Sequence, residues 1–396
     1  MLKTIRISNF KSLSNEPVSL SNFNVLIGAN ASGKSNFIDA FRFVYDILKS
    51  NRLSTAIGRR LGWANVLTRE KDLSNKISIE MNYDLRGMEP VRIGKKAYTP
   101  LDSEYKFEVS YRMKKYFMDS EILKTRFQLS KEEVFEGFER SRYKAQISSI
   151  FRGGTTTSMS VPKILRDSPF LQGYFSISGR FISNIITGWR FYDLDVNAAR
   201  RPCIEESETF LLDDGHNMAS ILNRLAYPSS RMVKKRILSL MSILVPGFED
   251  WKTEQQFDGS IGFKVREKGI SKFLLPKMVS DGTIRILSIL LGLLYQPSRA
   301  ALICIDEPER YLHPQVLKTL VEIMRDVSEK SQIIVTTHST ELVKWLRPSE
   351  VLMMDKIDNT TRIVRAQDVE MVDKFLEEFS FDELWLRGYL KGGKIS

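Results

Sequence analysis

Apolar residues recur along this chain with two different periods, and each period predicts a different kind of element. Near the N-terminus an apolar run over 23–27 stops at Gly28 and is followed by a helical pattern over 35–48, which predicts a strand, a glycine-rich turn and a helix. From Ile77 to about Lys144 the period is two, which predicts an antiparallel meander. A Gly/Thr/Ser-rich stretch from 153 to 162 then predicts a surface loop.

The second half of the chain carries helical patterns, first alone and then alternating with apolar strands. Helices are predicted near 181–189, 218–226 and 232–244. After residue 270, predicted helices and strands alternate. They are a helix over 282–295, a strand over 301–305, a helix over 315–327, a strand over 333–336 and a short helix over 341–345. This alternation is typical of an α/β protein with a parallel sheet buried on both faces.

Composition and charge narrow the class of protein. The 396 residues are 42% hydrophobic and 27% charged, which excludes a disordered or fibrous chain. The 59 Lys and Arg residues exceed the 48 Asp and Glu residues, and the net charge of +11 favours an acidic partner, although a basic surface can also be merely solvated. Two cysteines, Cys203 and Cys304, exclude a disulfide framework or a structural zinc site. We therefore expect a cytoplasmic chain that is neither exported nor embedded in a membrane.

The segment GANASGKS lies between the strand predicted over 23–27 and the helix predicted over 35–48. It matches the GxxxxGK[ST] phosphate-binding loop. Backbone N–H groups and the helix N-terminus would hold nucleotide phosphates. Lys34 would pair with the β- and γ-phosphates, and Ser35 would bind Mg²⁺. The predicted nucleotide-binding residues are Gly28, Asn30, Ala31, Ser32, Gly33, Lys34, Ser35 and Asn36.

Two apolar strands nearer the C-terminus end in residues that suit phosphate chemistry. The strand over 301–305 leads to Asp306, a candidate Mg²⁺ ligand, and to Glu307, a candidate general base for an attacking water. His338 follows the next apolar strand, from where an imidazole can contact a γ-phosphate, whereas a lone histidine in such a place is more often structural.

A Ser280-Asp281-Gly282 turn precedes the helix predicted over 282–295. Ser280 and Asp281 are good capping residues, and a capped helix N-terminus also attracts an anion. The structural and the functional interpretations of this turn therefore coincide.

Four ordered segments, GANASGKS, SDGTIRIL, LICIDEPERYLHP and IVTTHS, resemble the ABC-type ATPases of the SMC/RecF/OLD group. Within that group the chain resembles compact stand-alone prokaryotic "AAA family" ATPases (AAA_21/AAA_15-like), as do its segments WRFYDLDVNAARRP, LLDDGHNMASIL and FDELWLRGYLKGG. The resemblance implies an ABC-type P-loop NTPase head that binds ATP and Mg²⁺, with Glu307 and His338 as catalytic residues. It also implies a homodimer or a higher even oligomer, in which Ser280, Asp281 and Gly282 act in trans.

The resemblance divides the chain into four parts. They are an N-terminal P-loop part over 1–76, an antiparallel β lobe over 77–150, an inserted and mostly helical region over 151–269, and a signature, Walker B and H-loop part over 270–396.

Some segments match the family pattern less simply. Residues 311–314, Tyr-Leu-His-Pro, resemble the D-loop that crosses the dimer interface, and they also suit a helix entry with proline in its first turn. Ala31 stands where a glycine is common, and no Gln for the Q-loop is evident between residues 47 and 77. Asp193 and Asp195 form an Asp-x-Asp string that we interpret as structural or interfacial.

Two related architectures are not expected. No long coiled coil separates Ser35 from Ser280, which distinguishes the chain from full SMC proteins. The segment after His338 is shorter than the Toprim nuclease domain of OLD proteins, so we expect any nuclease to be a different protein.

Three functions remain open at this point. The first is an ATP-driven switch that controls a separately encoded effector, a nuclease or toxin, in prokaryotic anti-phage defence. The second is a RecF-like or SMC-like repair ATPase that clamps DNA directly. The third is a structural ATPase that holds an oligomer together with hardly any turnover. The candidate DNA-binding surface comprises Arg140, Arg142, Lys144, Arg152, Lys163 and Arg166.

Overall fold

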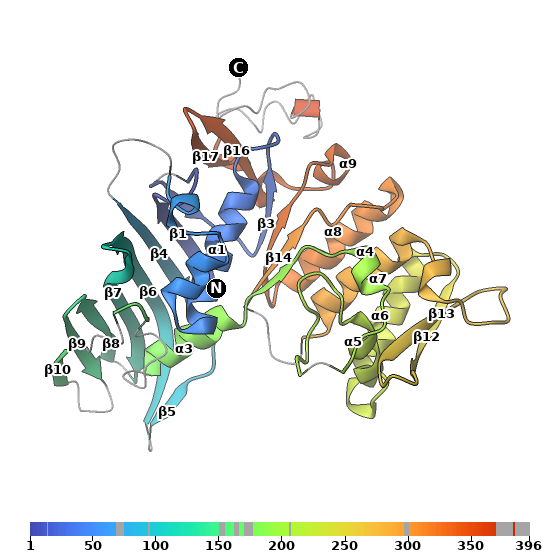
Figure 1. Ribbon diagram of the computed structural model, residues 1–396, viewed down its shortest axis with the longest axis horizontal. Coiled ribbons are helices and arrows are strands. Elements are labelled where there is room, and N and C mark those ends of the chain that lie inside the picture. Colours follow the sequence, from blue (N-terminus) through green and yellow to red (C-terminus); the bar gives the residue numbers. More distant parts are fainter. Residues whose placement is uncertain are drawn as a thin grey trace.

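A six-stranded sheet forms the centre of the molecule (Figure 1). The computed structural model describes residues 1–13, 15–68, 75–93, 96–130, 132–149, 155–161, 166–169, 177–205, 207–296, 301–369 and 383–384. The strands of this sheet, in spatial order, are β11 (Arg190–Tyr192), β14 (Leu302–Asp306), β15 (Gln332–Thr336), β3 (Phe23–Ile27), β16 (Val351–Ile357) and β17 (Thr360–Arg365). All neighbours pair in parallel except β16 and β17, so the predicted parallel sheet is confirmed.

The central strands are buried on both faces, and alternate residues enter two different cores. In β14 the side chains of Ile303 and Ile305 join one core, whereas Leu302 and Cys304 join the other. Strands of a parallel sheet that is covered on both sides read as continuous apolar runs, which is why the sequence located them.

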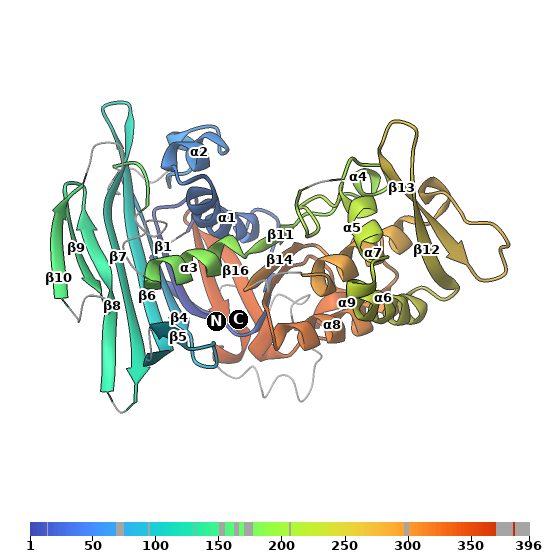
Figure 2. The same cartoon turned by 90° about the horizontal axis from the view of Figure 1, so that it is seen from below.

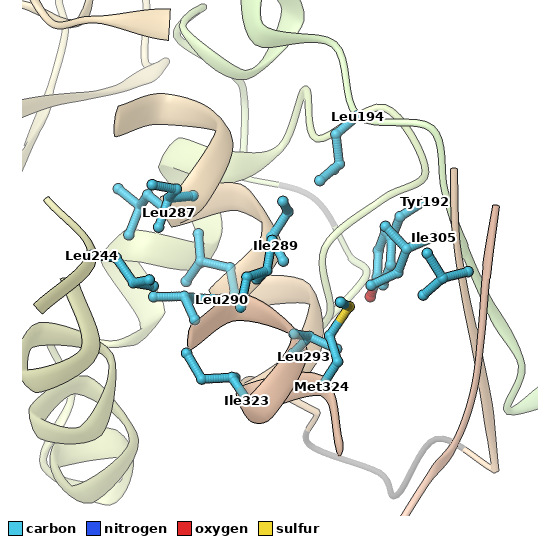
Figure 3. Packing of buried hydrophobic residues seen from close by; sticks show 14 of the residues in the cluster. Tyr192, Leu194, Leu244, Leu287, Ile289, Leu290, Leu293, Ile305, Ile323 and Met324 are labelled. Atoms are coloured by element: carbon cyan, nitrogen blue, oxygen red, sulfur yellow. The ribbon is translucent and has the colours of Figure 1, made fainter. Parts of the chain in front are cut away.

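Helices cover both faces of this sheet. On one face, α6 (Arg231–Leu244), α7 (Asp281–Leu294) and α8 (Pro314–Ser328) share one core with β14. In Figure 3, Leu293 and Met324 lie near Ile305, whereas Leu244 of α6 lies on the far side of α7. On the other face, α1 (Lys34–Ser50) and α3 (Ile177–Thr187) lie between the central sheet and the second large sheet (Figure 2). The remaining α-helices in the described part of the chain are α2 (Leu53–Gly58), α4 (Val196–Ala199), α5 (Met218–Arg224) and α9 (Thr340–Val343).

The second sheet is antiparallel and confirms the predicted meander. Its order is β10-β9-β8-β7-β6-β4-β1-β2, with β5 paired to β6. The strands are β1 (Leu2–Ser8), β2 (Pro17–Ser19), β4 (Lys76–Asp84), β5 (Val91–Ile93), β6 (Lys96–Arg112), β7 (Lys115–Leu129), β8 (Glu132–Ser141), β9 (Lys144–Ser149) and β10 (Thr155–Ser160).

Two strand assignments differ from the sequence prediction. The stretch from 153 to 162 was predicted as a loop, but its residues Thr155–Ser160 form β10, the last strand of the sheet, because they pair in register with β9. The region predicted as mostly helical also contains a hairpin of β12 (Phe248–Gln255) and β13 (Ile261–Glu267). A register shift near Phe248 interrupts the alternation of side chains that would have indicated β12.

Neither cysteine forms a disulfide. Among the helices that the structure describes, none combines the length and the hydropathy that crossing a bilayer requires.

Arg140 does not belong to a basic surface, which corrects the sequence prediction. Its side chain is 0% exposed, and its Nε lies 3.0 Å from Oε2 of the equally buried Glu121. The two residues face each other across β7 and β8, and Glu121 also accepts a hydrogen bond from the Tyr105 hydroxyl at 2.9 Å. Arg140 is therefore part of a buried polar network inside the antiparallel lobe.

Of the other candidate DNA-binding residues that the structure describes, Arg142 and Arg166 are engaged in contacts within the lobe. Arg142 pairs with Asp119 and lies over the Phe117 ring at 4.2 Å, while Arg166 lies over the Tyr143 ring at 4.7 Å. Lys144 is exposed, and Arg152 and Lys163 lie outside the described residues.

Replacement of Arg140 by Met should lower the free energy of unfolding of the protein by about 3–5 kcal/mol, because the Glu121 carboxylate would remain buried without its counter-ion. The measurement is chemical denaturation followed by circular dichroism. Lys144→Met, an exposed neighbour, is the matched control and should change the free energy by less than about 0.5 kcal/mol. Equal stability of the two variants would contradict the buried pair.

Candidate nucleotide-binding site

The phosphate-binding loop connects β3 to α1, and glycine is required at both of its ends. Gly28 has a φ of 155° and Gly33 a φ of 107°. A Cβ at Gly28 would clash with the carbonyl oxygen of Met354, and one at Gly33 would clash with the Thr361 side chain. The loop therefore passes closely against the β16–β17 hairpin.

Ala31 occupies a left-handed conformation, with a φ of 63°. An L-residue with a Cβ adopts this conformation at a cost of about 1–2 kcal/mol, which glycine avoids. A glycine would adopt this turn without that cost, and the alanine keeps the left-handed conformation.

Lys34 begins α1 and turns its side chain back into the loop. Its Nζ donates hydrogen bonds to the carbonyl oxygens of Gly28 at 2.7 Å and Ala29 at 3.0 Å. Burial lowers the pKa of the Lys34 ammonium, whereas the negative charges of Glu307 and Asp306 raise it. The predicted cation and the two predicted acids are therefore close enough to interact electrostatically.

The acidic turn lies at the carboxyl end of β14, beside the end of β15. Asp306 pairs in register with Thr336, and the Thr336 hydroxyl donates a hydrogen bond to its Oδ1. The Glu307 N–H donates to the Thr336 carbonyl oxygen at 3.0 Å. Glu307 itself has a φ of 41°, so the turn places this residue in a conformation that few non-glycine residues adopt.

Glu307 and His338, the two predicted catalytic residues, face each other. The His338 Nε2 lies 3.7 Å from the Glu307 Oε1, and the Arg310 Nε donates to the Glu307 Oε2 at 2.5 Å. Burial and the nearby Lys34 charge lower the pKa of His338 against the opposing effect of Glu307. This shift favours the neutral imidazole, which offers one hydrogen-bond donor and one acceptor.

Glu309 is a residue of this site that the sequence analysis missed. Its Oε1 accepts hydrogen bonds from the Thr337 hydroxyl at 2.6 Å and from the His338 N–H at 3.2 Å. Burial raises the pKa of the Glu309 carboxyl. Its position two residues after Glu307, close to the end of a buried strand, could have indicated it, since an acidic side chain is rarely buried unless it is paired.

Arg285 is the second missed residue, and it lies behind the acidic turn. This fully buried guanidinium donates to the carbonyl oxygens of Asp306 at 3.1 Å, of Glu307 at 2.7 Å and of Leu194. A single charged residue in the apolar helix TIRILSILL was the signal for it.

The turn of Ser280, Asp281 and Gly282, called the signature turn below, is held by contacts with residues of its own chain. The Ser280 Oγ accepts from the Thr283 N–H at 3.1 Å, and Asp281 pairs with Arg200 at 2.7 Å. A Cβ on Gly282 would approach the Tyr311 carbonyl oxygen to 2.9 Å, so the turn lies against the predicted D-loop. Within the described part of the chain, no hydrogen bond or ion pair joins this turn to the phosphate-binding loop.

Residues 311–314, the predicted D-loop, also form the predicted start of a helix. His313 is the N-cap of α8 and accepts from the Gln315 N–H at 3.3 Å, and Pro314 is the first residue of that helix. Tyr311 is 63% exposed beside the signature turn. The same short segment thus starts a helix and presents an aromatic ring to solvent.

The two aspartates of the Asp-x-Asp string have different environments. Asp195 caps α4 by accepting from the Asn197 N–H at 2.7 Å, which is a structural role. Asp193 lies 3.9 Å from the Arg310 Nη1 and lines the same cavity as Ser35 and Asp306.

This cavity offers the hard oxygen donors that suit Mg²⁺, namely the Ser35 hydroxyl and the Asp306 carboxylate. Within the described residues there is no group of three His, Cys, Asp or Glu side chains that could hold a metal alone. That set fits Mg²⁺, which binds to one or two protein ligands and takes its other ligands from phosphates and water.

Asn36 differs from the rest of the predicted set, since its side-chain amide turns away from the loop. Its Nδ2 donates to the Ser12 Oγ at 2.8 Å. Asn30 and Ala31 are exposed at the tip of the loop, and Ser32 and Gly33 are buried under it.

Comparisons with known proteins agree with this geometry. The family model described as "AAA domain, putative AbiEii toxin, Type IV TA system" (AAA_21) matches residues 23–344. No curated protein sequence matches the chain.

Among solved structures, the SMC head bound to the C-terminal winged-helix domain of ScpA is similar with a TM-score of 0.55 and 12% identity, covering 92% of this chain and 96% of that one. The SMC head with an extended coiled coil bound to the C-terminal domain of ScpA from Pyrococcus furiosus has a TM-score of 0.50 and 14% identity, covering 95% and 98%. At such identities these likenesses establish the fold, and the family model spans most of the sequence. The chain belongs to the AAA_21 family, and its fold is that of an ABC-type P-loop ATPase head of the SMC kind.

Proposed function

We propose that this protein binds and hydrolyses ATP with Mg²⁺ and acts as a switch whose two heads pair around nucleotide. The observation that carries the proposal is the convergence of Lys34, Asp306, Glu307 and His338 at the carboxyl ends of β3, β14 and β15, which are neighbours in the central sheet. In open α/β sheets, ligands bind at this edge.

Each residue has a distinct part in the reaction. The loop N–H groups and the N-terminus of α1 bind the phosphates, and the Lys34 ammonium neutralises their charge. Ser35 and Asp306 hold Mg²⁺, which would neutralise charge developing on the phosphate oxygens. Glu307 orients and polarises the attacking water, while the His338 imidazole donates a hydrogen bond to the γ-phosphate.

Contacts of Glu307 connect the proposed base to the surface where a second head would pair. One carboxylate oxygen is bonded to Arg310, and the other faces His338. The Oε1 oxygen thus keeps lone pairs for a water, and the ion pair with Arg310 links the proposed base to the D-loop. Arg310 immediately precedes the exposed Tyr311 of the D-loop, where a second head would make contact.

Pairing in trans is supported by the state of the signature turn. Ser280 is on the surface of its own subunit rather than at its own phosphate-binding loop, and Gly282 and Tyr311 lie together. In the proposed dimer, Ser280, Asp281 and Gly282 of one head would close over the nucleotide of the other.

We further propose that the nucleotide state controls a separately encoded effector, a nuclease or toxin, in anti-phage defence. The family description refers to a toxin of a toxin–antitoxin system, and the matched SMC heads bind ScpA, a separate protein. A direct DNA clamp is less well supported, because the basic surface expected for it includes the buried Arg140 and the paired Arg142.

Glu307→Gln should lower the ATP hydrolysis rate roughly 10²–10⁴-fold, because it removes the base while Lys34, Ser35 and Asp306 keep the nucleotide and Mg²⁺. With Mg-ATP the variant should also accumulate as a dimer. Steady-state phosphate release and light scattering after gel filtration measure the two effects. Glu329→Gln, an exposed substitution at the end of α8, is the control. A wild-type rate in Glu307→Gln would disprove the assignment of the base.

Lys34→Ala should weaken nucleotide binding roughly 10- to 100-fold, since a charge-assisted contact with phosphate contributes about 1.5–3 kcal/mol. Calorimetric titration with Mg-ADP measures the affinity. Lys49→Ala, in the exposed last turn of the same helix, should bind like the wild type. If both variants bind equally well, the loop does not hold the phosphates.

The effector part of the proposal is tested by co-expressing Glu307→Gln with the products of the adjacent genes. With Mg-ATP, the purified complex should contain a neighbouring gene product, and native mass spectrometry identifies it. The same experiment with Lys34→Ala should retain none. Pairing of Glu307→Gln heads that keeps no neighbour would count against an effector and in favour of a clamp that acts alone.

A further inference from the structure

The phosphate-binding loop is in contact with a residue that lies far from it in the sequence. Thr361, in β17, is 1% exposed, and its hydroxyl donates a hydrogen bond to the Ser32 carbonyl oxygen at 3.0 Å. The two residues are 329 positions apart. Because a Cβ on Gly33 would meet the same side chain, Thr361 also lies directly against the last residue before α1.

This hydroxyl is one member of a chain of hydrogen bonds. The Asn36 amide donates to the Ser12 hydroxyl at 2.8 Å, and the Ser12 and Thr361 hydroxyls lie 2.7 Å apart. Since the Thr361 hydrogen points to Ser32, the Ser12 hydrogen points to Thr361, and all donors run in one direction. The Thr361 N–H fixes the same segment by donating to the Ser12 carbonyl oxygen at 2.6 Å.

Bonds of this kind have a specific use in a phosphate-binding loop. Such a loop aims its N–H groups inward at the anion, so carbonyl groups on its outer side need other donors. Ser32 is 2% exposed, and a buried carbonyl without a donor costs about 1–3 kcal/mol. The Thr361 hydroxyl satisfies this carbonyl and so favours the orientation in which the neighbouring N–H groups face the phosphates.

We propose that Thr361 is a positioning residue for nucleotide binding, which acts on the phosphates through the Ser32 peptide. The inference rests on the proposed ATP-binding function of this loop. Thr361 touches no reacting atom, so its loss changes nucleotide affinity and KM far more than kcat at saturating ATP.

Thr361→Val removes the hydroxyl and keeps the branched shape. It should weaken Mg-ADP binding roughly 5- to 100-fold by calorimetry and raise the KM for ATP, while kcat changes less than about 2-fold. Thr361→Ser restores the donor and should recover most of the affinity. Thr360→Val, the neighbouring residue on β17, is the matched control and should bind like the wild type.

Two results would overturn the proposal. One is wild-type affinity in Thr361→Val, and the other is equal loss of affinity in Thr361→Val and Thr361→Ser. If Thr361→Val does not fold, Ser12→Ala takes its place, since it removes the hydroxyl that orients Thr361, and unchanged Mg-ADP affinity in that variant would contradict the proposal. Failure of the wild type to bind Mg-ADP would instead reject the proposed function itself, so the two failures are distinguishable.

Discussion

The acidic turn of Asp306 and Glu307 depends on one buried cation, Arg285. Its guanidinium has been removed from water, which lowers its pKa, and in the structure it donates to carbonyl oxygens of Asp306, Glu307 and Leu194. A buried charge requires such partners, because an unsatisfied one costs several kcal/mol. These bonds also hold the backbone of Glu307 at a φ of 41°. Such an unfavourable conformation persists only where the surrounding structure fixes it. The position of the proposed base, which follows β14, is thus set by a residue of a helix.

That helix is α7, whose first turn carries the signature residues. Ser280 caps it, Asp281 is tied to Arg200, and Arg285 follows one turn later. In the proposed dimer, a second head would contact Ser280 at the start of α7. The same helix carries Arg285, which bonds the Glu307 backbone, so both contacts involve one short rigid element. Since a helix of 14 residues with a buried apolar face does not bend at such a point without losing packing, displacement of the turn must strain or break the Arg285 bonds. This connection offers a physical route by which pairing of heads could adjust the base.

Much of this site was predictable from the sequence, since its parts follow apolar strands and carry recognisable local motifs. The strand before Gly28, Asp306 and Glu307 after β14, and His338 after β15 needed no long-range information. Features that depend on register were not predictable. Arg140 is buried because β7 and β8 pair so as to place it opposite Glu121, and β10 is a strand because its polar Thr and Ser residues pair with β9. The Thr361–Ser32 bond joins segments 329 residues apart, which no local pattern encodes.

The same long-range construction determines how the site responds to change. The phosphate-binding loop is bounded by Met354 and Thr361 of the C-terminal hairpin, and by Ser12 near the N-terminus. The acidic turn is bounded by Thr336 and by Arg285. Segments distant in the sequence therefore hold each half of the site in place. Because the two halves of the site are held by different segments, a change in the β16–β17 hairpin can alter the phosphate-binding loop while the acidic turn keeps its geometry, and a change in α7 can do the reverse.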